Sequence, residues 1–152
     1  SHGSARPLNC GVRRHMNLSE AFDEACSRLT SNDFASLSER DQILVSIWGL
    51  EADVNNGGFD EYYFNSSGDQ AWFVPTALRR IGANRMAAIT ERANDVFGEA
   101  GPPTDRNERQ SALFRITEAN EGPWDRLDQE FYAYPHDIAG LLVAHFGLSA
   151  SA

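Results

Sequence analysis

The sequence contains no lysine: its 13 basic residues are all arginines, and they face 22 acidic residues, for a formal net charge of −9. Neutralising the phosphates of a nucleic acid or of an anionic membrane requires clustered cations. An acidic excess therefore argues against direct binding of nucleic acid and of membranes. It favours a basic partner protein, or serves only to keep the chain soluble.

Cysteine and long apolar runs are also scarce. Cys10 and Cys26 are the two cysteines, and a structural disulfide is not expected from them. No apolar run approaches the ~20 residues that a transmembrane helix needs, and no signal-peptide pattern opens the chain. These absences predict a soluble, cytoplasmic protein.

Residues 1–15, with the sequence SHGSARPLNCGVRRH, are interpreted as a segment derived from a vector or tag, or as a flexible arm. They carry three arginines and no acidic residue. Without them 22 acidic residues face 13 − 3 = 10 basic ones, which gives a net charge of −12. The remaining residues, 16–152, are expected to form a single helical domain.

Apolar residues recur at helical spacing along the chain, and alternating strand patterns of any length are absent. Residues that commonly begin helices precede several of these runs: Asn17 with Glu20, Ser36 or Ser38, Asn84, Asp105 with Glu108, and Pro135. The sequence thus predicts an all-α fold, a single compact domain of roughly six to eight short helices.

The stretch VNNGGFDEYYFNSSGD, residues 54–69, differs from the rest of the chain. Asparagine and glycine tolerate positive φ, so residues 55–58 are predicted to reverse the chain after a helix. Phe59, Tyr62 and Tyr63 follow at helical spacing and are expected to be buried, while Asp60 and Glu61 turn outward.

A glycine-rich turn before a helix could instead bind phosphate through its amides. Asp60 and Glu61 in the first turn would repel an anion, and the spacing of a P-loop is absent. An architectural role is therefore favoured over a ligand-binding loop. The residues of this fold motif are Asn55, Asn56, Gly57, Gly58, Phe59, Tyr62 and Asn65.

The run LEADVNNGGFDEYYFNSSGD, followed by ALRRIGA, resembles the domain-of-unknown-function 4375 family, which includes a bacterial DNA mimic protein. The resemblance covers about residues 37–147 and departs mildly at Glu61, where the family would have glutamine. It implies a helical, acidic, intracellular protein that often self-associates. For the characterised type, it implies occupation of the DNA-binding face of a transcriptional regulator. Mimicry depends on where surface carboxylates lie, which the motif itself does not fix.

Two segments are rich in unbalanced acidic residues. Residues 41–78 hold six acidic residues and no basic one, and residues 118–137 hold six with Arg126 alone. Helix neighbours three or four positions apart place side chains ~5–6 Å from each other, so two packed acidic helices can approach the charge density of a DNA duplex. The candidate partner-binding carboxylates are Glu51, Asp53, Asp60, Glu61, Asp69, Glu118, Glu121, Asp125 and Asp128.

These features predict a non-catalytic, acidic protein-binding module, and a DNA mimic that occupies the basic face of a regulator or nuclease is one form of it. An immunity-type or antidote protein that neutralises a toxic enzyme would look the same, because nucleases also carry basic clefts. Trp48, Trp72, Phe73 and Trp124 are expected in the core. Trp72 and Phe73 precede a proline, however, and are also candidates to anchor a partner or the second subunit of a homodimer.

Residues suited to catalysis or metal binding are sparse. No H-E-x-x-H, paired C-x-x-C or G-x-S-x-G motif occurs. His145 is expected to be a core histidine on the apolar face of the last helix, and His136 beside Asp137 a helix-start feature. The sequence therefore predicts no catalytic residue, no cofactor and no metal. A small-ligand-binding protein or a carboxylate-based enzyme is the remaining alternative.

Overall fold

The computed structural model describes residues 16–149, which form seven α-helices, two short 3-10 helices and no β-strand. In chain order these are α1 (Leu18–Ser31), η1 (Phe34–Ser36), α2 (Glu39–Phe64), η2 (Ser66–Gln70), α3 (Val74–Arg80), α4 (Asn84–Asp95), α5 (Arg106–Ala119), α6 (Asp125–Tyr132) and α7 (Ile138–Phe146). The all-α prediction is confirmed. The interpretation of residues 1–15 falls outside the described residues. Among residues 16–149, no helix combines the length and apolar character that crossing a bilayer requires.

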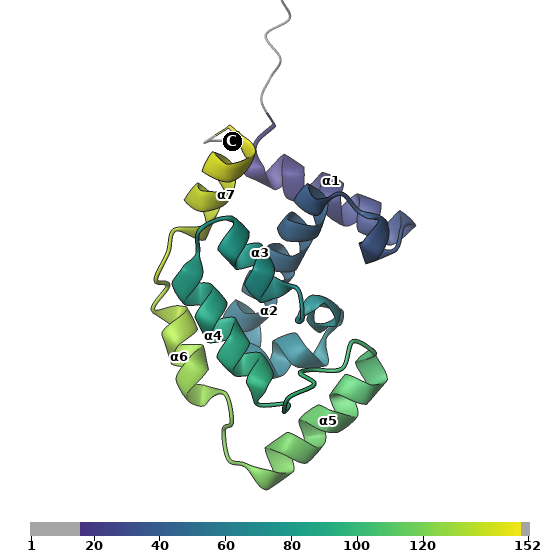
Figure 1. Cartoon of the computed structure of the whole chain (residues 1–152), viewed down its shortest axis with the longest axis vertical. Helices are drawn as coiled ribbons and strands as arrows, with labels where there is room; N and C mark the ends of the chain where they lie inside the picture. Colours follow the sequence, from purple (N-terminus) through teal and green to yellow (C-terminus); the bar gives the residue numbers. More distant parts are fainter. Residues whose placement is uncertain (1–15, 150–152) are drawn as a thin grey trace, which may run out of the picture.

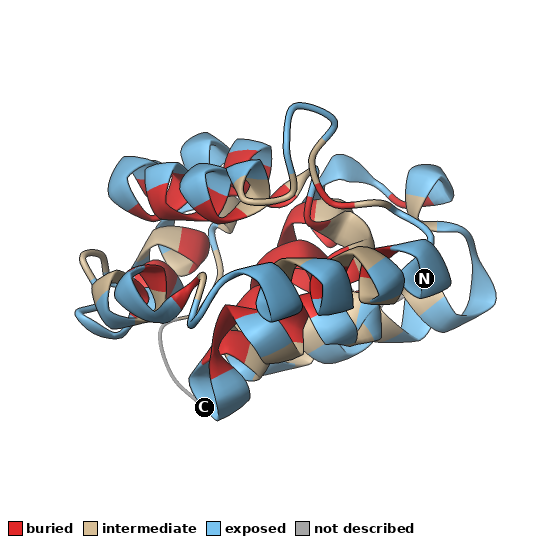
Figure 2. Cartoon of the chain, turned by 90° about the horizontal axis from the view of Figure 1, so that it is seen from below, coloured by how far each residue is buried: buried red, intermediate tan, exposed pale blue. Residues whose placement is uncertain are grey.

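Helix α2 lies at the centre of the fold, and α1, α3, α5, α6 and η2 all pack against it (Figure 1). Its inward side chains recur at helical spacing and are buried, as the sequence predicted: Ile43, Leu44, Ile47, Leu50 and Val54. The surrounding helices turn buried faces toward it and exposed faces outward (Figure 2). One core therefore joins the N-terminal and C-terminal halves of the described chain.

Three of the predicted helix starts are confirmed by side-chain hydrogen bonds to backbone N–H groups. Asn17 accepts from Glu20 at 2.9 Å, Ser38 from Asp41 at 3.2 Å, and Asp105 from Glu108 at 2.9 Å. Because each bond joins residues three positions apart, these signals are local and can be read from the sequence.

Two other predicted starts are wrong. Asn84 is the first residue of α4 and not its cap, and His136, 51 residues away, accepts from the N–H of Arg85 at 3.0 Å. Pro135 lies ahead of α7, whose N-cap is Asp137. The side chain that caps α4 is distant in sequence, so no local pattern predicts this cap.

The glycine-rich stretch forms a kink inside α2 and not the predicted chain reversal. Asn55 and Asn56 remain helical, and only Gly57 (φ −155°, ψ 20°) and Gly58 (φ 76°, ψ −174°) leave helical dihedrals. The conformation of Gly58 is essentially restricted to glycine. Past the kink, the three predicted aromatics are fully buried, and the ring centre of Tyr63 lies 5.3 Å from that of Trp124.

All three tryptophans were expected in the core, but the structure buries only one of them. Trp124 is buried, and its Nε1 donates to the carbonyl of Ala93 at 3.0 Å. Trp48 is 48% exposed, so its assignment to the core is wrong. Trp72 is 57% exposed, so its assignment to the core is wrong as well, whereas Phe73 is half-buried against the core. The two rings lie 5.6 Å apart and are tilted by 58°. The role of Trp72 in self-association stays a prediction.

Arg109 of α5 is fully buried, which the sequence gave no reason to expect. Its guanidinium donates five hydrogen bonds of 2.7–3.1 Å, to the carbonyl oxygens of Tyr63, Asn65, Pro103 and Thr104 and to the carboxylate of Asp69. Gly68 is required beside it, because a Cβ there would lie 2.8 Å from the Arg109 Nε. One side chain thus ties the end of α2, η2 and the loop before α5 together.

Replacing Arg109 with leucine is expected to lower the free energy of unfolding by roughly 3–5 kcal/mol, because it leaves a carboxylate and four buried or half-buried carbonyls without their donor. Denaturant titration measures this loss. Arg115→Leu is the matched control on the same helix, since Arg115 is exposed, and it should change stability by less than about 0.5 kcal/mol. Equal effects of the two substitutions would contradict the structural role of Arg109.

Candidate partner-binding surface

The two acidic segments predicted from the sequence meet at the kink of α2. Helix α6 packs on α2 there, and Asp128 Oδ1 accepts a hydrogen bond from the N–H of Phe59 at 2.9 Å, across 69 residues of chain. This N–H lies at the start of the helical segment that follows the kink, so Asp128 caps that segment from another helix. A Cβ on Gly58 would lie 2.7 Å from Asp128 Oδ2, which is a second reason for glycine at this position.

Asp60 and Asp125 lie close enough to Asp128 to repel it. Partial burial raises the pKa of Asp128, the hydrogen bond from Phe59 lowers it, and the charges of Asp60 and Asp125 raise it further. The pKa of Asp60 is likewise raised, first by desolvation and then by the charge of Asp125. None of the ion pairs within residues 16–149 includes any of these three aspartates. Three carboxylates from two helices therefore share one location without a basic partner.

Glu61 and Tyr132 extend this location. Tyr132 is 44% exposed, and its hydroxyl donates to the carbonyl of Val54 at 2.8 Å. Desolvation raises the pKa of Tyr132, and the nearby charges of Asp128 and Glu61 raise it further. Tyr132 thus stands close to carboxylates from both helices. We define the acidic patch as Asp60, Glu61, Asp125, Asp128 and the ring of Tyr132.

Three other candidate carboxylates are engaged inside the fold. Asp69 pairs with the buried Arg109 at 2.8 Å, and Asp53 accepts from the side chain of Asn65 at 3.3 Å. Glu51 accepts from the hydroxyl of Tyr134 at 3.2 Å, and burial raises its pKa. Because each of these three carboxylates forms a hydrogen bond within the fold, we assign it a structural role.

The last two candidates, Glu118 and Glu121, are exposed at the end of α5 and in the loop that follows it. None of the ion pairs within the described residues includes either of them. The structure therefore brings together four of the nine carboxylates predicted from the sequence, and leaves five outside the patch.

A hollow adjoins the acidic patch, between the end of α2 and α5. It has a volume of about 510 Å³, and its lining is Gly57, Asp60, Glu61, Phe64, Asn65, Leu113, Phe114 and Thr117. Phe64 is 43% exposed and Phe114 is 58% exposed. Sequence analysis missed both phenylalanines, because their spacing along each helix gives no sign that they face a common space. The acidic patch thus borders an apolar surface.

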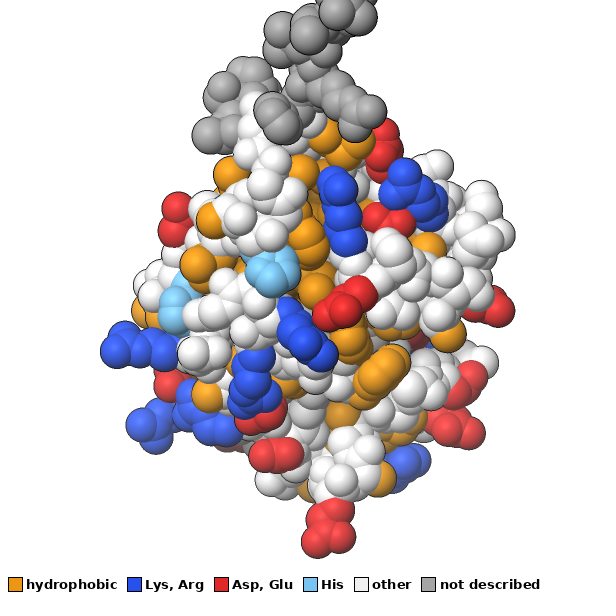
Figure 3. All heavy atoms as spheres, turned by 45° about the horizontal axis from the view of Figure 1, so that its top comes forward, with side chains coloured by type: hydrophobic (Ala, Val, Ile, Leu, Met, Phe, Trp, Pro, Cys, Tyr) orange, Lys and Arg blue, Asp and Glu red, His pale blue; other side chains and the backbone are white. Residues whose placement is uncertain are grey.

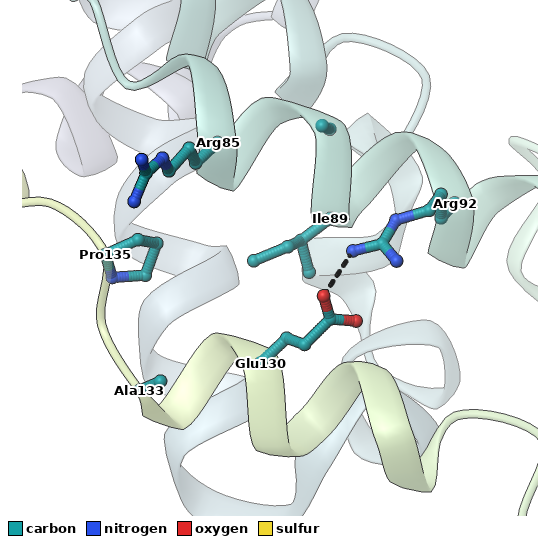
Figure 4. A pocket seen from close by; sticks show the side chains of 7 residues that line it. Arg85, Ile89, Arg92, Glu130, Ala133 and Pro135 are labelled. Carbon is teal, nitrogen blue, oxygen red and sulfur yellow. Dashed lines mark hydrogen bonds and ion pairs between the residues drawn. The ribbon is translucent and has the colours of Figure 1, made fainter.

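A second hollow, of about 320 Å³, lies between α4 and the end of α6. Figure 4 shows its apolar floor of Ile89, Ala133 and Pro135 between Arg85 at one end and Arg92 at the other. Arg92 donates to Glu130 at 2.7 Å, so its charge is balanced. The face drawn in Figure 3 likewise shows arginines interspersed with carboxylates. Neither region resembles the acidic patch, where carboxylates gather without arginine.

Two histidines, His136 and His145, lie within the described residues. His136 caps α4, which agrees with its prediction as a helix-start residue although the helix is a different one. His145 is exposed, with its ring edge against Phe146, so its assignment to the core is wrong. No group of three or more His, Cys, Asp or Glu side chains among residues 16–149 could hold a metal ion.

Comparison with known proteins gives one match. A family model described as DMP19-like protein matches residues 35–150, well over half of the chain. Neither the curated proteins nor the solved structures include a significant match. The domain-of-unknown-function 4375 label that the sequence suggested stays a prediction.

Removing the acceptor at position 128 is expected to destabilise the kink. Asp128→Ala should lower the free energy of unfolding by about 1 kcal/mol, as the loss of an N-cap does. Asp128→Asn keeps an oxygen that can accept from Phe59 and is the matched control, expected within about 0.5 kcal/mol of the parent. Denaturant titration compares them. An alanine variant as stable as the asparagine variant would show that the cap contributes nothing.

Neutralising Asp60 should stabilise the protein at neutral pH. Because the folded-state pKa of Asp60 is raised, folding favours its protonated form, and its contribution to stability is lost as the pH rises through that pKa. Asparagine carries no charge, so Asp60→Asn should raise the free energy of unfolding at pH 7 by a few tenths of a kcal/mol, as relief of a like-charge pair does.

The gain from Asp60→Asn should fade below about pH 4, where the parent carboxyl is itself protonated. Urea midpoints measured at both pH values test this, with Glu118→Gln as a single-charge control outside the acidic patch. A variant less stable than the parent at neutral pH would mean that repulsion at the patch is absent.

Proposed function

Because the chain belongs to the DMP19-like protein family, we propose that it is a non-catalytic, acidic protein-binding module that mimics DNA toward the basic surface of another protein. The family name suggests a DNA mimic protein. The proposal takes from this the kind of partner, a protein whose arginines and lysines ordinarily contact phosphates.

The observation that carries the proposal is the acidic patch. The charge of Asp125 raises the pKa of Asp60, and the charges of Asp60 and Asp125 raise that of Asp128. None of the ion pairs within the described residues includes these three aspartates. Asp128 has a structural use as a cap, whereas Asp60 and Asp125 have no recorded bond that offsets their repulsion. Repulsion among these carboxylates raises the free energy of the unbound protein. A cationic surface that covers them relieves this repulsion and so favours binding.

The mechanism is competition. Partner arginines and lysines pair with the carboxylates of the patch and are then unavailable to DNA phosphates. Such association is steered at long range and weakened by salt, since the Debye length falls from ~10 Å at 0.1 M to ~3 Å at 1 M. A basic cleft of a nuclease satisfies the same requirement as the DNA-binding face of a regulator. The partner's own chemistry decides between inhibition of transcription and neutralisation of an enzyme.

Affinity capture from a lysate of the source organism tests this proposal, with excess duplex DNA as competitor. The parent protein should retain a DNA-binding protein that DNA displaces. The variant Asp60→Asn/Glu61→Gln/Asp125→Asn should bind that partner about tenfold more weakly or worse, which corresponds to ~1.4 kcal/mol or more. It leaves the cap at Asp128 in place.

The control removes three exposed carboxylates outside the patch, in the variant Asp33→Asn/Asp95→Asn/Glu99→Gln, so that the net charge changes equally. It should retain the partner. Equal loss in both triple variants would indicate an effect of net charge alone, and a partner indifferent to DNA would contradict mimicry.

A further inference from the structure

The hollow between Phe64 and Phe114 borders the acidic patch and is lined in part by apolar side chains. Both rings are about half exposed, one at the end of α2 and the other in the middle of α5, and the buried Leu113 closes the space between the helices. A volume of about 510 Å³ falls within the range of ordinary ligand pockets and can hold more than one large side chain. Exposed aromatics that line a common hollow are the usual anchors of protein interfaces.

The walls of this hollow are fixed in the free protein. The carbonyl of Phe64 accepts from Gln110 Nε2 at 2.9 Å and from Arg106 Nε at 3.4 Å, so that the end of α2 is fastened to α5 beside the hollow. Arg109 binds the carbonyls on both sides of Phe64, at Tyr63 and Asn65. A partner therefore meets a preformed site and does not have to order it, which favours affinity.

The charges of the hollow determine what it can accept. Asp60 and Glu61 belong both to its lining and to the acidic patch, and no arginine or histidine is among its lining residues. Glu61 accepts a hydrogen bond from the side chain of Asn56 at 2.7 Å, but neither carboxylate belongs to an ion pair of the described residues. An occupant that is wholly apolar would desolvate both carboxylates without supplying a cation. An occupant with an apolar side chain flanked by cationic ones satisfies the rings and the carboxylates together.

We propose that the hollow between Phe64 and Phe114 receives an apolar side chain from a basic amphipathic helix of the partner. This inference rests on the proposed function, because the partner is the same basic protein. A groove between two helices accepts a third helix whose apolar residues recur at positions i, i+3 or i+4, and i+7. Residues beside this stripe, lysine or arginine, then reach Asp60 and Glu61. DNA offers no counterpart to the apolar contact, so this part of the interface is specific to protein.

The probe for the experiment is a synthetic, fluorescein-labelled helix of about 18 residues, with leucines at the apolar positions and lysines or arginines elsewhere. A second peptide of equal charge carries serine in place of each leucine. Fluorescence anisotropy measures binding to the whole chain at about 0.1 M and about 0.5 M NaCl, where screening of the carboxylates differs. The leucine peptide should keep measurable binding at the higher salt concentration, and the serine peptide should lose it.

Phe114→Ser identifies the site, since this exposed side chain can be replaced with little effect on folding. It should weaken binding of the leucine peptide about tenfold or more at both salt concentrations, as loss of an aromatic anchor does. Trp48→Ser is the matched control, with a similarly exposed aromatic outside the hollow, and should bind as the parent does. Denaturation midpoints confirm that both variants fold.

Three results would overturn the inference. The first is binding of the leucine peptide to Phe114→Ser as tight as to the parent, and the second is equal binding of the two peptides. The third is a Phe114→Ser variant that sediments as a monomer where the parent sediments as a dimer, since the occupant would then be a second copy of this chain.

The same variants separate this inference from the proposed function. One outcome is that Phe114→Ser retains the DNA-displaced partner in full while the triple variant of the acidic patch loses it. This outcome would support DNA mimicry by the acidic patch and contradict docking of a partner helix in the hollow. If both variants retain that partner, the acidic patch is not its binding site and the proposed function fails as well.

Discussion

The buried guanidinium of Arg109 is the interaction on which the surface depends. The last carbonyl groups of a helix have no partner within it, and at the end of α2 those of Tyr63 and Asn65 turn toward a side chain that offers several donors at once. Arginine is suited to this position because its planar fork can satisfy several acceptors together, and Asp69 balances its charge. The bonds to Pro103 and Thr104 then fix where α5 begins. Because α5 is fixed, the hollow between Phe64 and Phe114 exists as a preformed space.

The kink contributes the second constraint. Gly58 lets the backbone change direction where any side chain would meet Asp128, and Asp128 satisfies the N–H that the kink exposes. This contact holds α6 against α2, and it is what brings Asp125 next to Asp60. The acidic patch is therefore a consequence of how the kink is capped. Asp128 has a structural role as a cap, and its position brings Asp60 and Asp125 close to it. These two carboxylates repel Asp128 in the free protein.

The sequence predicted those features whose determinants are near neighbours in the chain. Caps three residues from their partners, the inward face of α2 and the buried aromatics after the glycines all follow from spacing. The errors concern residues whose partners are remote: His136 accepts from the N–H of Arg85, 51 residues before it, and Arg109 looks in sequence like any surface arginine. The chain reversal expected at residues 55–58 is a kink, because the two asparagines keep helical dihedrals and only the two glycines leave them.

The acidic surface was predictable in kind but not in position. Counting charges along the chain pointed to two segments, and these segments do meet. Which carboxylates remain free there depends on tertiary partners, since Glu51, Asp53 and Asp69 each found a hydrogen-bonding group in the fold. The apolar hollow had no sequence signal, because Phe64 and Phe114 are 50 positions apart and line a common space only where α5 packs on α2.

Arginine placement explains why a moderate net charge can give a distinct acidic patch. Arginines elsewhere pair with carboxylates on the surface, as Arg79 does with Glu91 and Arg92 with Glu130. Such pairs leave little field at a distance. The stretch between residues 41 and 78 contains no arginine, so the charge of Asp60 and Glu61 is not offset locally. Charge alone attracts any cationic surface, whereas an apolar anchor beside it selects among them. The proximity of the hollow to the patch is thus what would let an acidic protein recognise one basic partner among many.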